Sequence, residues 1–131
     1  MIPYAVKCGR VPMGIYREFL TMCRYTQMFP DPPEGDLTCH AVCKALAMRF
    51  ESFRCVDGHF DGIFQHSWLV PSKHQNIVVD MYPVAGVGSF MLDTDHFGDR
   101  WAERYVSERK PNFCKKQVRE HIDFLLAKWP E

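Results

Sequence analysis

The sequence predicts an α+β fold in which helices pack against an antiparallel sheet. Two stretches with helical spacing of apolar residues come first, three short strand-like stretches follow, and helical spacing returns near the C-terminal end. Strands joined by short turns pair as antiparallel neighbours. A chain of 131 residues has the length of one domain and can bury a core without disulfide or metal support. We therefore expect a single domain over residues 1–131.

The first two predicted helices are separated by a loop rich in proline. The first helix covers 12–28, because proline suits a first helical turn and apolar residues recur on one face. The segment 29–36, FPDPPEGD, interrupts this spacing and is expected to be a loop. The second helix covers about 37–50, and either Asp36 or Thr38 suits its N-cap.

Three strands are predicted next, at 52–58, 64–70 and 76–82. Each is rich in β-branched or aromatic residues and is bounded by residues that favour turns. Gly58 is expected to end the first strand and to begin a loop that reaches residue 62. The segment that begins at Pro83 and reaches residue 90 is expected to be irregular, because proline cannot donate a hydrogen bond to a sheet.

Two further helices complete the predicted order α, α, β, β, β, α, α. A short one is expected at 99–106, and the last covers about 113–129 with Asn112 as its N-cap. The apolar stripe of the last helix suits packing on the core rather than a groove for a partner. This stripe consists of Val118, Ile122, Leu125 and Trp129.

Composition and charge exclude several classes of function. The formal net charge is zero, whereas binding to nucleic acid or to an anionic membrane favours a basic excess. The hydrophobic fraction of 47% and the charged fraction of 24% are those of a soluble globular domain. No apolar run is long enough to span a bilayer.

Six cysteines are too few for a disulfide-stapled scaffold of this length. The first residues, MIPYAVKCGR, lack the pattern of a secretory signal. We therefore expect reduced thiols and a cytoplasmic location.

A histidine and an aspartate are predicted to meet across the second hairpin. If its loop covers 71–75, Leu69 faces Ile77 and His66 faces Asp80. Directly opposite residues place their Cβ atoms about 5 Å apart on one face of the sheet. The Asp80 carboxylate would then accept the proton on Nδ1 of His66 and leave Nε2 free as a base.

Cys39 lies in the first turn of the second predicted helix. The unpaired N–H groups and partial positive charge of a helix N-terminus favour thiolate over thiol and can hold an oxyanion. Cys43 lies one turn further on and is expected to pack as a small apolar residue. In chain order, Cys39, His66 and Asp80 form the arrangement of a thiol nucleophile, a base and an acid that orients the base.

These residues resemble the transglutaminase-like branch of the papain-like cysteine proteases. In that branch a Cys opens a helix, a strand ending near Gly follows, and then come a His-Ala-Trp strand and a strand ending in Asp. The matching segments here are Cys39 with Ala41 and Cys43, RCVDG ending at Gly58, HSWL from His66, and IVVD ending at Asp80. The resemblance covers about residues 35–83, and Ser67 stands where Ala is usual.

The resemblance implies a papain-like/transglutaminase-like fold, with the Cys-bearing helix packed on a small antiparallel sheet and helices flanking it at both ends. It makes Cys39 the nucleophile, His66 the general base and acid, and Asp80 the orienting residue of a catalytic triad. The implied function is a cysteine hydrolase or acyl transferase acting on an amide through a thioester, such as a peptidase, an amidase or a glutamine deamidase. The expected partner is a protein or peptide substrate, with no cofactor, metal ion, nucleic acid or membrane.

Two alternatives remain open at this point. Cys39, Cys43, Cys55 and His59 have the spacing C-x3-C-x11-C-x3-H, which suits a zinc site in a binding module. The chain could also be a catalytically silent interaction module, because no Gln precedes Cys39 in the loop to complete an oxyanion hole. Aromatic residues expected at the surface agree with that second alternative, namely Phe60, Phe64 and Tyr82.

The other histidines are assigned no role. His40 follows Cys39 and is expected to point to solvent or to the end of the helix. His74 and His121 are expected to be exposed, and His96 lies in a predicted solvated loop.

Overall fold

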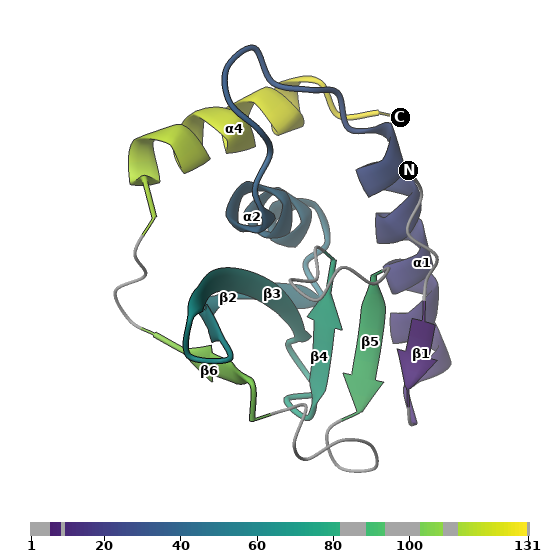
Figure 1. Cartoon of the computed structure of the whole chain (residues 1–131). Coiled ribbons are helices and arrows are strands. Elements are labelled where there is room, and N and C mark those ends of the chain that lie inside the picture. Colours follow the sequence, from purple (N-terminus) through teal and green to yellow (C-terminus); the bar gives the residue numbers. More distant parts are fainter. Residues whose placement is uncertain (1–5, 9, 82–88, 94–102, 109–112, 131) are drawn as a thin grey trace.

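The computed structural model of the chain describes residues 6–8, 10–81, 89–93, 103–108 and 113–130 (Figure 1). None of the helices in these ranges is both long and apolar enough to cross a membrane. In chain order the elements are β1 (Val6–Cys8), α1 (Met13–Met28), α2 (Cys39–Arg49), β2 (Phe53–Phe60), β3 (Phe64–Pro71), β4 (Ile77–Asp80), β5 (Phe90–Asp93), β6 (Tyr105–Ser107) and α4 (Lys115–Ala127).

The strands form one sheet with the order β1-β5-β4-β3-β2-β6. The strands from β5 to β6 are antiparallel neighbours, whereas β1 pairs parallel to β5 at one edge. Figure 1 shows the sheet curled, with β2 and β3 bending away from the flatter part formed by β4, β5 and β1. The predicted α+β class with antiparallel pairing is therefore confirmed.

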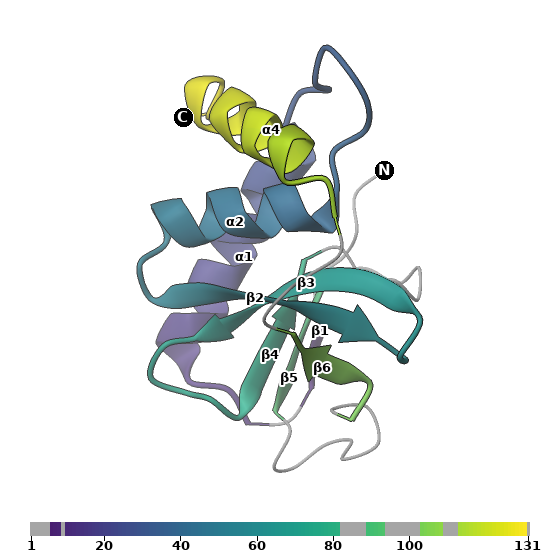
Figure 2. The ribbon, with the colours of Figure 1, turned by 90° about the vertical axis from the view of Figure 1, so that its left-hand side faces the viewer.

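The Cys-bearing helix α2 lies at the centre of the molecule. In Figure 2 it lies between α4 and the β2–β3 ribbon, while α1 packs beside it. Apolar residues from α1, α2, α4 and the middle strands fill the space between them, and burying them supplies most of the driving force for folding. The fully buried members of this core include Phe19, Met22, Cys43, Leu46, Leu69, Val79, Met91 and Leu125.

Helices α1, α2 and α4 match the sequence prediction closely, because the spacing of their apolar residues is a local feature. The Thr38 side chain caps α2 by accepting a hydrogen bond from the Ala41 N–H, so Thr38 rather than Asp36 is the N-cap. The last helix begins slightly later than expected, after Cys114. Asn112, the expected cap, lies outside the described residues.

Gly58 does not end β2, contrary to the prediction. The strand continues to Phe60, and the expected loop shrinks to the turn 61–63. Gly58 pairs with His66 on one side and with Ser107 of β6 on the other. A Cβ atom at this position would lie 2.0 Å from the backbone oxygen of Val106. The glycine therefore permits the close approach of β6.

The predicted helix at 99–106 is wrong where it can be compared. Tyr105 and Val106 lie in strand β6 and pair with Phe60 and His59, while residues 99–102 lie outside the described ranges. The two short strands β1 and β5 were not predicted either. Of the segment 83–90, expected to be irregular, only residues 89 and 90 are described, and β5 begins at Phe90.

Candidate active site

Cys39 is the first residue of α2 and thus lies in the first turn, where the sequence predicts it. Thr38 caps the helix, and the Val42 N–H bonds to the Thr38 carbonyl, so the first regular turn is already closed. The N–H groups of Cys39 and His40 have no acceptor within a helix that begins here. Cys39 is partly exposed as a residue, so it lies near solvent at the positive end of the helix.

His66 and Asp80 meet, although the register of their hairpin differs from the prediction. Leu69 pairs with Val79 rather than with Ile77, which shifts β4 by two residues along β3. Because side chains alternate with a period of two, a shift of two keeps His66 and Asp80 on the same face as diagonal neighbours. Both side chains are fully buried, and His66 Nε2 lies 2.9 Å from Asp80 Oδ2.

The hydrogen bond uses the opposite nitrogen from the one expected. Nε2 of His66 donates to Asp80, so Nδ1 is the nitrogen left for Cys39. This Nδ1 is buried and has no hydrogen bond of regular geometry to any of the described residues. A buried polar atom without such a bond is costly in a purely structural position. An unpaired ring nitrogen beside a thiol is suited to exchange a proton with it.

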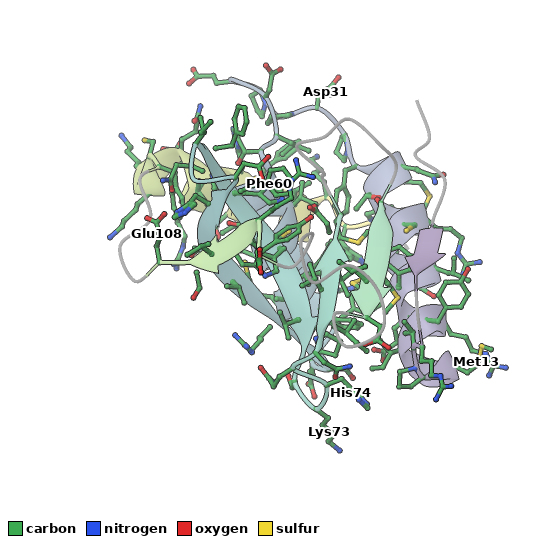
Figure 3. All side chains as sticks on the ribbon, turned by 60° about the horizontal axis from the view of Figure 1, so that its bottom comes forward. Met13, Asp31, Phe60, Lys73, His74 and Glu108 are labelled. Atoms are coloured by element: carbon green, nitrogen blue, oxygen red, sulfur yellow. The ribbon has the colours of Figure 1, made fainter. Side chains whose placement is uncertain are left out.

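Aromatic rings surround the His66 imidazole. The centroids of Phe60, Trp68 and Tyr105 lie 6.2, 6.0 and 6.0 Å from the centroid of the His66 ring. The Tyr105 hydroxyl also donates a hydrogen bond of 2.6 Å to Asp80 Oδ2. Figure 3 shows Phe60 far from Lys73 and His74, which lie at the tip of the β3–β4 turn. The site therefore lies at the end of β3 that is remote from this turn.

The charges of these groups favour an ion pair between Cys39 and His66. Burial raises the pKa of the Cys39 thiol, but the neighbouring imidazoles of His40 and His66 lower it to about 6. Burial lowers the pKa of His66, but the Asp80 carboxylate and Cys39 raise it to about 9. Between these values a thiolate and an imidazolium coexist, which is the reactive form of a cysteine nucleophile.

The other buried thiols differ sharply from Cys39. Burial raises the pKa of Cys23 and of Cys55 to about 11. Cys43 is fully buried, its pKa is raised well above the usual value by burial, and its thiol lies 3.4 Å from the carbonyl oxygen of Ser67. The prediction that Cys43 packs as a small apolar residue is thus confirmed.

Sequence reasoning missed the second imidazole beside Cys39. His40 was expected to point to solvent, yet it is 6% exposed and its Nδ1 lies 2.6 Å from Ser67 Oγ. Ser67 Oγ donates a hydrogen bond of 2.6 Å to Asp57 Oδ1, and Lys44 forms an ion pair with Asp57. The available signal was a pair of polar residues, Asp57 and Ser67, that face each other in the adjacent strands β2 and β3.

Two groups of side chains thus meet at Cys39. We call His66, Asp80 and Tyr105 the His66 arm, and His40, Ser67, Asp57 and Lys44 the His40 arm. In the His66 arm, a ring nitrogen of the histidine bonds directly to a carboxylate. In the His40 arm, a ring nitrogen bonds to the Ser67 hydroxyl, which in turn bonds to a carboxylate. The arms lie on opposite faces of β3, because His66 and Ser67 are consecutive strand residues.

The residues of the alternative zinc site have other partners. Cys55 contacts Lys44, and His59 pairs with Glu108 at the edge next to β6. Among the described residues, no group of three or more His, Cys, Asp or Glu side chains is arranged to hold a metal ion. All four proposed ligands lie in the described part of the chain, and they do not form such a group.

The aromatic surface expected of a silent module is present only in part. Phe60 is 2% exposed and belongs to the surroundings of His66, whereas Phe64 is 49% exposed. Tyr82 lies outside the described residues, as does His96. His121, expected to be exposed, is 5% exposed and bonds through Nε2 to the carbonyl oxygen of Glu34.

No family model, no curated protein and no solved structure matches this chain. The resemblance to transglutaminase-like proteins therefore stays a prediction from the sequence, and any function has to be argued from the geometry of the site.

Proposed function

We propose that the protein is a cysteine hydrolase or acyl transferase that acts on an amide of a protein or peptide. The observation that carries this proposal is the position of Cys39 at a helix N-terminus beside His66, whose far nitrogen bonds to Asp80. The pKa of Cys39, lowered to about 6, and that of His66, raised to about 9, support the same assignment. A papain-like/transglutaminase-like fold is part of the proposal.

The proposed first half-reaction is the acylation of Cys39. The thiolate attacks the carbonyl carbon of the amide, and the backbone N–H of Cys39 stabilises the negative charge on the carbonyl oxygen. The carbon–nitrogen bond then breaks, and the amine takes the proton from Nδ1 of the His66 imidazolium. The products are a thioester on Cys39, a neutral His66 and the free amine.

The proposed second half-reaction transfers the acyl group to an acceptor. Water as the acceptor makes the protein a peptidase, amidase or deamidase, whereas a lysine amine makes it a transglutaminase. The triad is shared by these reactions, so the arrangement supports acyl transfer from an amide as a class. Asp80 acts through His66 as a positioning residue, and Tyr105 holds the Asp80 carboxylate.

Alkylation of the thiols tests the proposal without knowledge of the substrate. The protein is treated with iodoacetamide at pH 6, and the rate at each cysteine is followed by peptide mass mapping. A thiol with a pKa near 6 is half thiolate at that pH, whereas an ordinary thiol is ~0.3% thiolate. After allowance for the lower nucleophilicity of the weaker base, Cys39 should react about tenfold faster than an ordinary exposed thiol. Cys114 is exposed and supplies the internal reference.

A matched pair of histidine variants shows whether His66 is responsible. His66→Asn should move the pH midpoint of Cys39 alkylation upward, because the imidazolium that stabilises the thiolate is gone. His74→Asn is the control, since His74 lies in the β3–β4 turn at the far end of the strand. Equal rates at Cys39 and Cys114 at pH 6, or an unchanged midpoint in His66→Asn, would contradict the proposal.

A further inference from the structure

The hydrogen bonds of the His40 arm define which nitrogen of His40 can exchange a proton. Burial raises the pKa of Asp57, but hydrogen bonds from Lys44 and Ser67 and the Lys44 charge lower it overall, so Asp57 is ionised and only accepts. Ser67 has one hydroxyl proton, and it donates that proton to Asp57 Oδ1. The Ser67 oxygen must then accept from His40, so Nδ1 of His40 carries a proton. Nε2 is left as the nitrogen that gains and loses one.

This arrangement holds the His40 ring in a single orientation next to Cys39. Nδ1 is anchored on Ser67, and one face of the ring packs on Phe113 with the ring centroids 4.3 Å apart. His40 occupies the first turn of α2 directly after Cys39. A buried imidazole with an assigned tautomer, whose second nitrogen can accept a proton, has the properties of a general base.

The His66 arm is poorly placed to take a proton from an acceptor that arrives from solvent. His66 has no exposed surface, and Phe60, Trp68 and Tyr105 surround its ring. Cys39 is the member of the triad that solvent reaches. His40 follows Cys39 in the chain, and its imidazole also neighbours the thiol, so it is the second imidazole available to an acceptor that approaches a thioester on Cys39.

We propose that His40 is a second acid–base residue of this site, which deprotonates the acceptor in the second half-reaction while His66 serves the first. Ser67 and Asp57 are its positioning residues. The proposal rests on the proposed function, because it needs a thioester on Cys39. It assigns the two half-reactions to two different histidines.

The proton balance of the second half-reaction is complete with water as the acceptor. Water attacks the thioester carbon and gives one proton to Nε2 of His40. The carbon–sulfur bond breaks, Cys39 leaves as the thiolate, and the carboxylic acid product gives its proton to the neutral His66. His40 then releases its proton to solvent, where the departed amine takes it up. The site returns to the thiolate, the His66 imidazolium and a neutral His40.

The test uses p-nitrophenyl acetate, an activated ester whose leaving group needs no acid. Wild-type protein should release a burst of p-nitrophenol as Cys39 is acetylated, followed by a slower steady rate that reports deacylation. The variant Cys39→Ser should show no burst. An acetylated thiol carries no proton, so the steady rate does not depend on the pKa of Cys39.

The decisive variant is His40→Asn, whose side-chain amide nitrogen replaces Nδ1 and keeps a donor for Ser67. The burst amplitude should stay close to one acetyl group per chain, while deacylation should fall by about 100-fold, the lower range for a general base. Added imidazole should restore part of the deacylation rate in His40→Asn and have little effect on wild type. Ser67→Ala should slow deacylation by about tenfold, because Nε2 remains but the ring is no longer oriented.

The outcomes separate this proposal from the one on which it rests. A burst with deacylation in His40→Asn within about twofold of wild type, or slow deacylation that imidazole does not restore, would overturn the role of His40 alone. The absence of a burst in wild-type protein would overturn the proposed function, and the role of His40 with it.

Discussion

The two arms that meet at Cys39 differ mainly in how the charge of their carboxylate is balanced. Asp80 is fully buried and bonds directly to His66 and to the neutral hydroxyl of Tyr105. Asp57 is half-buried and forms an ion pair with Lys44, and it reaches His40 only through Ser67.

This difference explains why His66 keeps its proton at neutral pH. The charge of Asp80 acts directly on His66, in a buried environment where electrostatic interactions are strong, and the pKa of His66 is raised to about 9. Asp57, in contrast, is paired with the Lys44 ammonium and reaches His40 only through the Ser67 hydroxyl. The His66 imidazole is thus charged at neutral pH through direct contact with its carboxylate.

The largest effect on the His66 arm is expected from Gly58→Ala. A Cβ atom at Gly58 would lie 2.0 Å from the Val106 oxygen and 2.8 Å from the Ser107 Cα. Strand β6 would have to move away, and Tyr105 would leave Asp80. We expect the free energy of unfolding to fall by about 3 kcal/mol, at the upper end of overpacking costs, as measured by urea denaturation.

The matched control is Gly14→Ala in α1. No atom lies within 4 Å of a Cβ at that position, and alanine in a helix is more favourable than glycine by about 0.5–1 kcal/mol. This variant should be slightly more stable than wild type. Equal stabilities of Gly58→Ala and Gly14→Ala would contradict the packing of β6 against Gly58.

The same glycine shows why part of the fold escaped prediction. The helices α1 and α2 were predicted because the spacing of their apolar residues and the cap Thr38 are local features. Gly58 was interpreted locally as the end of a strand, whereas its role is to let β6 approach from about 50 residues further along the chain. Helical spacing around Tyr105 was likewise overridden by pairing with β2, because tertiary context outweighs propensity in short segments.

The candidate site, like the fold, could be predicted from the sequence only in part. The approach of His66 to Asp80 tolerated an error of two residues in the register, because only an odd shift changes the face of a strand. The nitrogen that bonds to Asp80 depends on the ring orientation and could not be derived from spacing. The contact of His40 with Ser67 depends on how α2 packs on β3, which no local pattern encodes.

Replacing each carboxylate in turn sharpens the comparison. Asp80→Asn keeps an acceptor for Tyr105 but removes the charge that raises the pKa of His66. The Cys39 thiolate then loses its imidazolium partner, and its pKa should rise from about 6 toward the usual ~8.5. Alkylation of Cys39 by iodoacetamide at pH 6 should slow by about tenfold.

Asp57→Asn is the counterpart in the His40 arm. The amide still accepts from Ser67, and the lost charge was already offset by Lys44. We expect alkylation of Cys39 at pH 6 to change by less than about threefold. An effect as large as that of Asp80→Asn would mean that the two arms contribute equally to the thiolate, which contradicts the comparison.

The pH dependence of stability distinguishes a coupled pair from two independent groups. The pKa of His66, raised to about 9, gives stability that is fully present below the unfolded value of ~6.5 and is lost as the pH rises through the folded value. The pKa of Cys39, lowered to about 6, gives stability that is present above the unfolded value of ~8.5 and is lost as the pH falls through the folded value.

The two groups change the free energy of unfolding with pH in opposite directions, so their contributions to its slope against pH should cancel. From about pH 6.5 to 8.5 the pair holds one proton in the folded protein, on His66, and one in the unfolded chain, on Cys39. The free energy of unfolding of wild type relative to the double variant Cys39→Ser, His66→Asn should therefore be constant over this range. A slope near 1.4 kcal/mol per pH unit would show that only one of the two groups is shifted.

The smallest expected effect belongs to Cys55→Ser, which tests whether proximity to charged groups is enough to activate a thiol. Cys55 lies 3.6 Å from the Lys44 ammonium, but burial and the Asp57 carboxylate outweigh that cation and raise the pKa of Cys55 to about 11. Cys55 is therefore a thiol at neutral pH and contributes nothing to the reactivity of Cys39.

In Cys55→Ser, iodoacetamide should modify Cys39 at the wild-type rate, and purified protein should contain no stoichiometric zinc before or after the substitution. Wild-type protein with one zinc ion per chain, lost in Cys55→Ser, would instead support the metal-site alternative. The expected result would show that Cys39 differs from the other thiols because its partner is an imidazole anchored on a carboxylate. A cation near a thiol, as at Cys55, would not be enough to produce this difference.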